Sequence, residues 1–387
     1  MSSKTSELLF ALIRSSVFNI DIPEELTAEM KSSLRDIYRE AKRQDLGHLL
    51  FDPLSHIGII SKDDEGYSGL EKEKLSAIFR SVKMERELTC IKAVLTEEKI
   101  LHIPLKGAVI RALYPESYMR TSCDIDLLVR KEDLERVISL FQERLKYTTD
   151  GKMGYHDISL FSPSGVHIEL HFSILENIEK LDRVLCRVFD FAAPTNEGAF
   201  TYALTNEFLL FHLAAHASYH FVKGGSGIKP VIDLYLLDKK IEYNRDVLLS
   251  LLREAEIEKF FISCERLSAV WFECEEHDEL TKSMESFILE GGVYGTEESL
   301  AASIQAKQGG KFKTIFRLIF LPYKSLKVLY PALEKRRILM PIYQIRRWFR
   351  IIFKGRLGKA VKTIKANTAV TDEARKSTVK LFTELGL

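Results

Sequence analysis

Two aspartates, Asp124 and Asp126, lie two positions apart in SCDIDLLVR, a stretch that otherwise has the composition of a buried β-strand. Side chains alternate between the faces of a strand, so the two carboxylates point the same way, about 7 Å apart, while Ile125 points the other way. Two like charges this close repel, and burial without partners raises the pKa of at least one of them. The stretch therefore predicts cations as partners of these carboxylates.

A second strand with a polar face follows at VHIELHF. Its apolar residues alternate with His167, Glu169 and His171, which share one face. If this strand lies next to DIDLLV, Glu169 joins Asp124 and Asp126 in a three-carboxylate cluster. Mg²⁺ prefers oxygen ligands, so the three acids are predicted to hold one or two Mg²⁺ ions. Such a site supports phosphoryl or nucleotidyl transfer, with one of the acids helping to deprotonate the acceptor.

The segment PLKG upstream predicts a phosphate-binding turn. Gly107 lets the backbone approach a phosphate closely, Lys106 adds a positive charge, and the following helix points its N-terminal amides at the same place. Arg120 lies four residues before Asp124. It either steadies a nucleotide triphosphate or pairs with the acids, and the residues leave both uses open.

The combination of PLKGAVIRALYPESYMRTSCDIDLLVRKEDLERVISLF with YHDISLFSPSGVHIELHF resembles the polymerase-β-type nucleotidyltransferase superfamily. Within it, the chain is most similar to a bacterial branch of largely uncharacterised nucleotidyltransferases with Lys-Gly where most members have Gly-Ser or Gly-Gly. The close resemblance covers residues 100–172, and a weaker one continues through FHLAAHASYH, IKPVIDLYLL and GGVYG into the tail segment LPYKSLKVLYPALEKRRILMPIYQIRRWFR. The resemblance implies that Asp124 and Asp126 are the paired metal ligands and that Glu169 is the third acid. It also implies that Lys106 and Gly107 form the phosphate-loop element.

Histidines accompany the predicted acids in two places. His167 and His171 flank Glu169 and permit a transition-metal site through imidazole. The favoured interpretation is that they orient the carboxylate or contact substrate. Farther along, HLAAHASYH places three histidines at helical spacing on one face, where packing is the commoner role. Among these, His216 is a candidate substrate contact.

Periodicity predicts the elements that must position these residues. The strongest helical pattern covers residues 70–98, and the order strand, helix, strand, helix, hairpin then predicts a small mixed α/β (α+β) sheet of about 100 residues. N-terminal helices and a larger C-terminal helical region flank this sheet. Residues 1–95 are predicted to form an N-terminal helical segment and residues 96–195 a nucleotidyltransferase core. A helical domain is predicted for 196–310 and a basic helical tail for 311–387.

The composition, with 46% hydrophobic and 29% charged residues, is that of a globular protein and excludes a disordered chain. The longest apolar runs are shorter than the roughly 18 residues that a transmembrane helix needs, so none is predicted. The five cysteines are scattered and form no CxxC motif. Reduced thiols in a cytoplasmic protein suit this pattern better than disulfides or a zinc ribbon.

The net charge of +1 hides a segregation, because residues 311–365 contain 16 Lys or Arg and one acid, Glu334. This region, called the basic tail below, predicts contact with an anionic partner such as nucleic acid, phosphate groups or a lipid surface, or with the acidic remainder of the chain. The favoured interpretation is a helical subdomain whose apolar faces pack on the body of the protein.

The sequence thus predicts a Mg²⁺-dependent nucleotidyltransferase that moves a nucleoside monophosphate from an NTP to an acceptor. A small molecule, a peptide or protein, and an RNA all remain open as the acceptor, and the residues do not rank ATP against other NTPs. One alternative is a non-catalytic binding protein that keeps the fold and uses its basic tail for an anionic partner. A metal-dependent phosphoesterase is the other.

Overall fold

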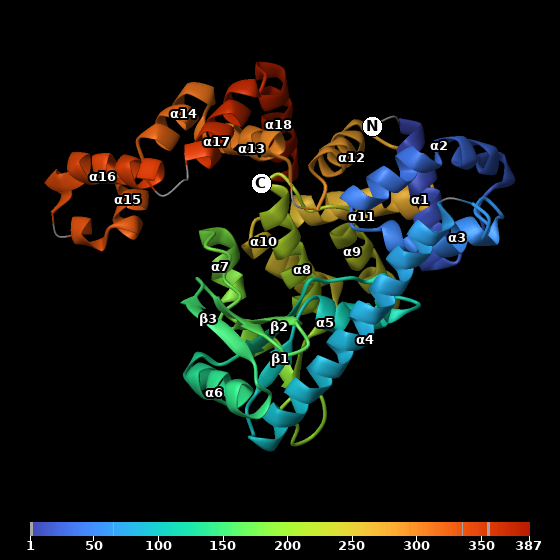
Figure 1. Ribbon diagram of the computed structural model, residues 1–387, viewed down its shortest axis with the longest axis horizontal. Helices are drawn as coiled ribbons and strands as arrows, with labels where there is room; N and C mark the ends of the chain where they lie inside the picture. Colours follow the sequence, from blue (N-terminus) through green and yellow to red (C-terminus); the bar gives the residue numbers. More distant parts are fainter. Residues whose placement is uncertain (1–2, 65, 294, 335, 354–356) are drawn as a thin grey trace. The chain divides into compact units, whose positions relative to one another are not determined.

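The computed structural model describes residues 3–64, 66–293, 295–334, 336–353 and 357–387 (Figure 1). The backbone divides into two compact units. The first unit runs to Tyr219 and continues from Ile228 to Thr281, whereas the second contains His220–Gly227 and Lys282–Leu385. The predicted finer division into four segments stays a prediction.

Helices precede the sheet, as the apolar spacing predicts. Their bounds are α1 Ser3–Phe18, α2 Glu24–Arg43, α3 Phe51–His56 and α4 Tyr67–Glu97. Leu8, Leu9 and Leu12 of α1 are fully buried, which is the consequence of an apolar stripe at helical spacing. The long helix α4 agrees with the predicted helix 70–98 to within three residues at each end.

Within the described residues, the main sheet has five strands in the order β1-β2-β5-β4-β3. Their bounds are β1 His102–Pro104, β2 Asp124–Val129, β3 Thr148–Met153, β4 Asp157–Phe161 and β5 His167–His171. Strand β2 pairs in parallel with β5, and the other neighbours are antiparallel. The predicted mixed sheet and the β4–β5 hairpin are therefore confirmed.

Strand β3 and a small second sheet, formed by β6 Ala192–Pro194 and β7 Tyr202–Leu204, are not predicted by the sequence. Strand β3 has the sequence TTDGKM and is largely exposed, so it lacks the apolar alternation that identifies a strand. It pairs with β4 at the sheet edge through an irregular register. Backbone hydrogen bonding to β4 defines this strand, and the spacing of apolar residues in the sequence cannot reveal such bonding.

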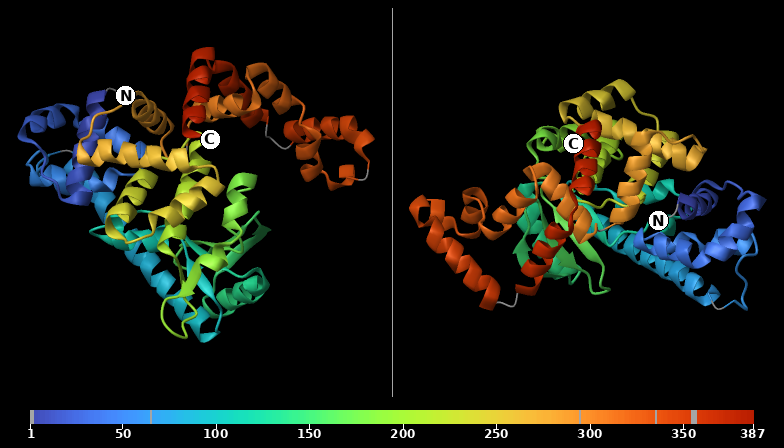
Figure 2. Two further views of the ribbon diagram at one scale, coloured as in Figure 1. Left: turned by 180° about the vertical axis from the view of Figure 1, so that it is seen from behind. Right: turned by 90° about the horizontal axis from the view of Figure 1, so that it is seen from above.

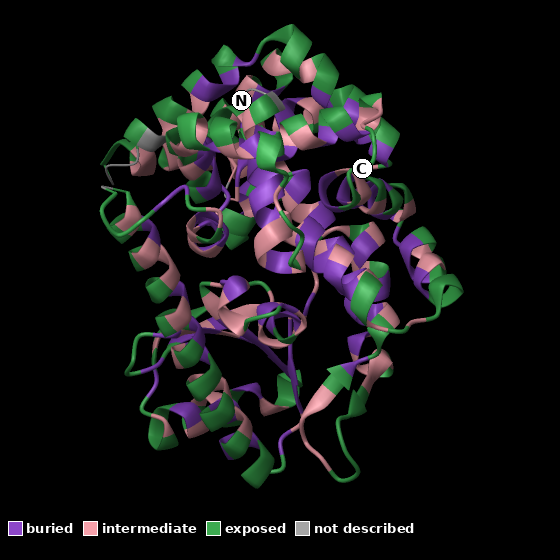
Figure 3. Cartoon of the chain, turned by 90° about the vertical axis from the view of Figure 1, so that its right-hand side faces the viewer, coloured by how far each residue is buried: buried purple, intermediate pink, exposed green. Residues whose placement is uncertain are grey.

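One face of the main sheet is apolar and covered by α4 and by α6 Leu134–Arg144 (Figures 1 and 2). Ile125 and Leu127 of β2 and Ile168 and Leu170 of β5 point into this core and are at most 1% exposed. Such interior positions are purple in Figure 3. The strand residues between them must point to the opposite face, which carries the predicted site.

Helical segments make up the rest of the chain. Around and after the sheet, the first unit contains α5 Gly107–Ile110, α7 Glu179–Leu185, α8 Asn206–Phe221 up to Tyr219, α9 Lys229–Lys240, α10 Arg245–Glu254 and α11 Glu258–Glu273. The later helices are α12 Glu279–Gly291, α13 Glu297–Gln308, α14 Lys311–Ile319, α15 Tyr323–Leu329, α16 Met340–Phe353, α17 Leu357–Ala369 and α18 Asp372–Leu385. Among the described helices, none has the length and apolarity needed to cross a membrane.

A buried histidine in the first unit predicts a loss of stability in acid. Burial lowers the pKa of His48 to about 4, and the charge of Lys229 acts in the same direction. A hydrogen bond between His48 Nε2 and the Met119 carbonyl opposes this shift, as do the charges of Asp45 and Glu73. Because this folded-state pKa is below the unfolded value, the stabilisation is complete above pH ~6.5 and is lost as the pH falls towards 4, by at most about 3 kcal/mol.

Urea unfolding followed by Trp271 fluorescence, in a Trp348→Phe background, measures this loss. Trp271 is buried in the first unit and reports on it alone. His48→Gln should flatten the decline between pH 6.5 and 4.5, whereas His56→Gln, at an exposed position, should leave it unchanged. An unchanged slope in His48→Gln would contradict the assignment.

Candidate active site

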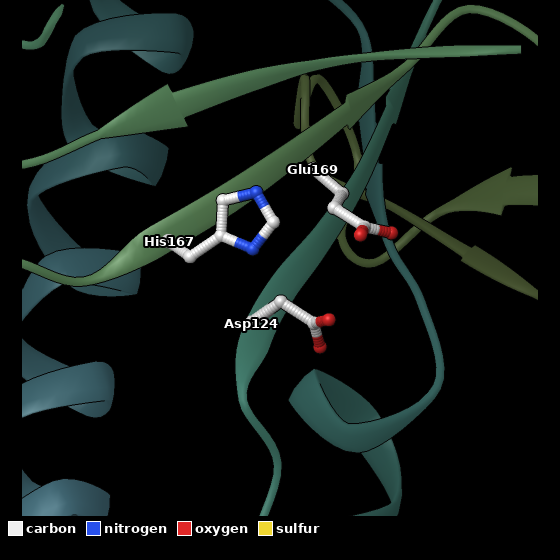
Figure 4. A group of neighbouring side chains, drawn as sticks. All are labelled: Asp124, His167 and Glu169. Carbon is white, nitrogen blue, oxygen red and sulfur yellow. The ribbon is translucent and has the colours of Figure 1, made fainter. Parts of the chain in front are cut away.

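The register of β2 and β5 brings the predicted acids together. Asp124 lies opposite His167 and Asp126 opposite Glu169 in the parallel ladder. The side chains of Asp124, His167 and Glu169 project from the two strands on one side of the sheet (Figure 4). The two strands are therefore neighbours, as the predicted cluster required, and the period-two alternation of both places these side chains on one side of the sheet.

Two neighbouring side chains compensate the buried carboxylate of Asp126. Lys106 Nζ donates to Asp126 Oδ1 at 2.9 Å, and His171 Nε2 lies 2.9 Å from the same oxygen. Burial alone would raise the pKa of Asp126, but Lys106 and His171 outweigh it and hold the pKa below its usual range. Burial likewise disfavours the Lys106 ammonium, yet the Asp126 charge raises its pKa. The cation that the sequence predicts as a partner is thus, in part, Lys106.

The other two acids carry uncompensated repulsion. Burial and the Asp126 charge raise the pKa of Asp124, and burial with the Asp126 and Asp124 charges raises the pKa of Glu169 to about 7. The Glu169 side chain is 29% exposed and the Asp126 side chain 6%. An additional positive charge at this face would therefore favour the ionised form of all three carboxyl groups.

The donor atoms suit a metal ion. Asp124, His167 and Glu169 form one group whose ligand atoms all lie within 4.8 Å of one another, and Asp126, Glu169 and His171 form a second. Ligands of a shared Mg²⁺ lie at most about 4.2 Å apart, twice the metal–oxygen distance, so small side-chain movements bring either group into range. Glu169 belongs to both groups and each group includes one histidine, whereas Asp124 and Asp126 share no group among the described residues.

The turn between β1 and α5 holds Lys106 in an unusual backbone conformation, with φ 45° and ψ −121°. A non-glycine residue at positive φ costs about 1–3 kcal/mol and persists where the surrounding structure enforces it. A Cβ on Gly107 would lie 3.2 Å from Ser122 Oγ, so a larger residue here would require that serine to shift by a few tenths of an ångström. Helix α5 has only four residues, so its contribution of N-terminal amides is smaller than the sequence suggested.

Arg120 does not pair with the three acids, since its Nε donates to both carboxylate oxygens of Asp233 in α9, at 2.8 and 2.9 Å. Tyr114 donates its hydroxyl to the same carboxylate at 2.8 Å. The side chains of Arg120 and Asp233 are 14% and 4% exposed. This buried pair ties the segment before β2 to α9, and it replaces the predicted pairing of Arg120 with the acids.

Several polar side chains around the site come from elements that the sequence analysis did not connect with it. Ser159 of β4 lies with its hydroxyl 2.9 Å from His167 Nε2, and the rings of His156 and His171 are 5.4 Å apart. The alternation of β4 could have identified Ser159, because its register partner is Glu169. His156 lies in a loop and carries no such signal.

The α8 histidines take separate environments. His216 Nδ1 lies 2.8 Å from Glu176 Oε1, so Glu176 orients its ring. His212 is buried, and burial together with the Lys106 charge lowers its pKa to about 3. His212 is therefore neutral and close enough to Lys106 to feel its charge. A substrate contact by His167, His171 or His216 stays a prediction.

A cavity of about 720 Å³ lies where α4 crosses the start of β2 and β5. Cys123 and Val166, the residues just before Asp124 and His167, line it. On α4, its lining includes cationic and apolar side chains, namely Lys72, Arg80, Lys83, Leu75 and Phe79. The lining also includes the acid Glu71, so its cations outnumber its acids three to one. The cavity is adjacent in sequence to the metal-candidate residues and suits a substrate with negative charge and apolar surface.

Comparison with known proteins gives one match. The model of a family described as uncharacterised nucleotidyltransferase matches residues 31–273, nearly two thirds of the chain. This range includes both strands of the site and ends before the basic tail, so the weaker likeness expected in the tail is not part of the match. The searches of curated proteins and of solved structures return no match.

Proposed function

The chain belongs to the uncharacterised nucleotidyltransferase family, and from this premise we propose that it transfers a nucleoside monophosphate from an NTP to an acceptor hydroxyl or phosphate, releasing pyrophosphate. The observation that carries the proposal is the register placing Asp126 beside Glu169 and Asp124 beside His167 on one face of the sheet. The same face carries the Lys106 turn, and the cavity on the α4 side of the sheet reaches the residues that precede Asp124 and His167.

In the proposed mechanism, Asp124, Asp126 and Glu169 would hold one or two Mg²⁺ ions. When bound, these ions would neutralise phosphate charge and favour both attack and departure of oxygen. The Glu169 side chain is more exposed than that of its neighbour Asp126, and we propose that Glu169 takes the proton from the acceptor hydroxyl. Asp126, buried and held by Lys106 and His171, would keep a fixed orientation.

Lys106 and Gly107 are proposed to contact the β- and γ-phosphates of the NTP. The Lys106 ammonium is placed beside the acids by its hydrogen bond to Asp126, so a triphosphate drawn to this face meets a positive charge. Arg120 is proposed as a positioning residue, because Asp233 engages its guanidinium. We propose the cytoplasm as the place of action, where NTPs and reduced cysteines coexist.

Two measurements test the proposal. The first is isothermal titration with NTP in the presence and absence of Mg²⁺, and the second is the transfer of label from an α-labelled NTP to a component of a cell extract. We expect Mg²⁺-dependent binding and a labelled acceptor with the wild type, and neither with Asp124→Ala/Asp126→Ala. Absence of NTP binding to the wild type, or undiminished transfer by the double variant, would refute it. Release of nucleotide without a labelled acceptor would assign phosphoester hydrolysis instead.

The acceptor is proposed to bind in the cavity on the α4 side of the sheet and to reach the acids past the strand ends that precede Asp124 and His167. Arg80→Glu/Lys83→Glu reverses two lining charges and should lower labelling of the acceptor about tenfold, because each partly exposed charge contributes roughly 0.5–1 kcal/mol. The affinity for NTP and Mg²⁺, measured by titration, should stay within about twofold. Arg86→Glu/Lys92→Glu makes the same change on α4 outside the cavity lining and should leave labelling unchanged. Equal loss in both double variants would exclude a specific acceptor site there.

A further inference from the structure

The basic tail combines a surplus of positive charge with exposed apolar side chains. Residues 311–365 contain 16 Lys or Arg and one acid, and they lie outside the region that the family model matches. The large exposed apolar residues of the tail are Phe312, Phe316, Ile319, Phe320, Val328, Leu329, Ile338, Ile342, Ile345, Phe349, Ile352, Phe353, Leu357 and Val361. Scattered exposed apolar residues are normal on a protein surface, but a concentration beside so many cations indicates an interaction surface.

Helix α14 has two distinct sides. Phe312, Phe316 and Ile319 recur at helical spacing, and the first two are 90% and 62% exposed. Thr314, about 170° around the helix from the midpoint of this stripe, is fully buried. The exposed Lys313 borders the stripe. The apolar stripe of α14 is therefore not the side that packs within the second unit.

Helix α16 repeats this arrangement of an exposed apolar stripe and a buried opposite side. Ile342, Ile345, Phe349 and Ile352 lie at i, i+3, i+7 and i+10 and are 61%, 50%, 55% and 53% exposed. Gln344 lies on the other side, where it is buried and donates to the Leu321 carbonyl. The stripe is thus a second apolar face on a helix that already packs through another.

The two helices are joined into one surface element. Trp348 of α16 donates its indole N–H to the carbonyl of Ile319, and Arg347 donates to the carbonyls of Ile319 and Leu318. The Trp348 and Phe320 rings are 5.3 Å apart. Contacts from α16 therefore satisfy the C-terminal end of α14 and fix the two stripes relative to each other.

The side-chain types select the partner. Cations on an amphipathic helix are attracted to anionic head groups, and exposed Phe, Ile and Val insert at the boundary between head groups and acyl chains. The five exposed phenylalanines of the tail could stack on the bases of a single-stranded RNA, but its nine other large exposed apolar residues are aliphatic and offer no stacking surface, whereas all fourteen can insert among lipids. We propose that the basic tail docks on the surface of an anionic phospholipid bilayer through the exposed stripes of α14 and α16.

Sedimentation of the full chain with lipid vesicles tests this docking, independently of nucleotide transfer. Vesicles of phosphatidylcholine with phosphatidylglycerol should bind the wild type at least about tenfold more tightly than phosphatidylcholine alone, and binding should weaken with salt. Phe312→Ser/Phe316→Ser/Phe349→Ser should weaken binding about tenfold or more, because it removes three exposed aromatic side chains. Lys313→Glu/Lys324→Glu should weaken binding to the anionic vesicles only.

The control removes exposed apolar residues from the first unit, in Ile20→Ser/Val247→Ser/Ile262→Ser, which should bind vesicles like the wild type. Circular dichroism of each variant reports whether its helices form. The proposal is overturned if wild type fails to bind anionic vesicles, if it binds both vesicle types equally, or if the folded phenylalanine variant binds undiminished. Tight binding of a single-stranded RNA that depends on the lysines and not on the phenylalanines would also overturn it.

Discussion

Asp126→Asn should lower the rate of nucleotidyl transfer about a thousandfold while preserving the fold. The substitution keeps the size of the side chain but removes the charge that the proposed Mg²⁺ would meet, and metal stabilisation of the transition state contributes several kcal/mol, at about 1.4 kcal/mol per tenfold in rate. Asp126 also accepts hydrogen bonds from Lys106 and His171, so its loss disturbs both neighbours. Transfer of α-labelled nucleotide at saturating NTP and Mg²⁺ measures the effect.

Asp150→Asn is the matched control, since Asp150 lies in β3 of the same sheet and pairs with Lys152 at an exposed position. Its rate should remain within about twofold of wild type, because an exposed ion pair contributes little. Urea unfolding separates loss of activity from loss of structure. Transfer by folded Asp126→Asn within a few-fold of wild type would remove Asp126 from the proposed metal site and leave it as a structural partner of Lys106.

The sequence predicted which strand faces carry the acids of the site, because short-range rules determine the face. Alternation places Asp124 and Asp126 on one face of β2, and the same rule places Glu169 on one face of β5. The hairpin preceding Glu169 was recognisable from its turn residues, SPSG. That β2 and β5 are neighbours was a condition of the predicted site, and their parallel pairing comes from the structure.

Long-range pairing explains what the sequence did not predict. Arg120 was assigned to nucleotide or acids because Asp124 is its near neighbour, yet its partner Asp233 lies 113 positions away in another helix. The pairing of Lys106 with Asp126 likewise depends on how β1 docks on β2. Strand β3 depends on β4 for its backbone partners. In each case the contact joins two elements that are distant in the sequence, and no local sequence pattern shows that these elements pack together.

Arg120→Met should destabilise the first unit by about 3–5 kcal/mol, because it leaves the buried carboxylate of Asp233 without its cation. Asp233→Leu should cost a similar amount for the converse reason. The double variant Arg120→Met/Asp233→Leu replaces the pair with apolar side chains and should recover most of the loss. Urea unfolding followed by Trp271 fluorescence in the Trp348→Phe background measures all three.

Arg245→Met breaks the exposed pair of Arg245 with Glu265 and is the matched control, with an expected cost below about 1 kcal/mol. Nucleotide titration of the double variant then separates the two roles considered for Arg120. A positioning role requires that NTP affinity recover together with stability, since the segment before Asp124 is again held against α9. A phosphate contact requires that stability recover while NTP affinity stays about tenfold or more below wild type, because the guanidinium is still missing.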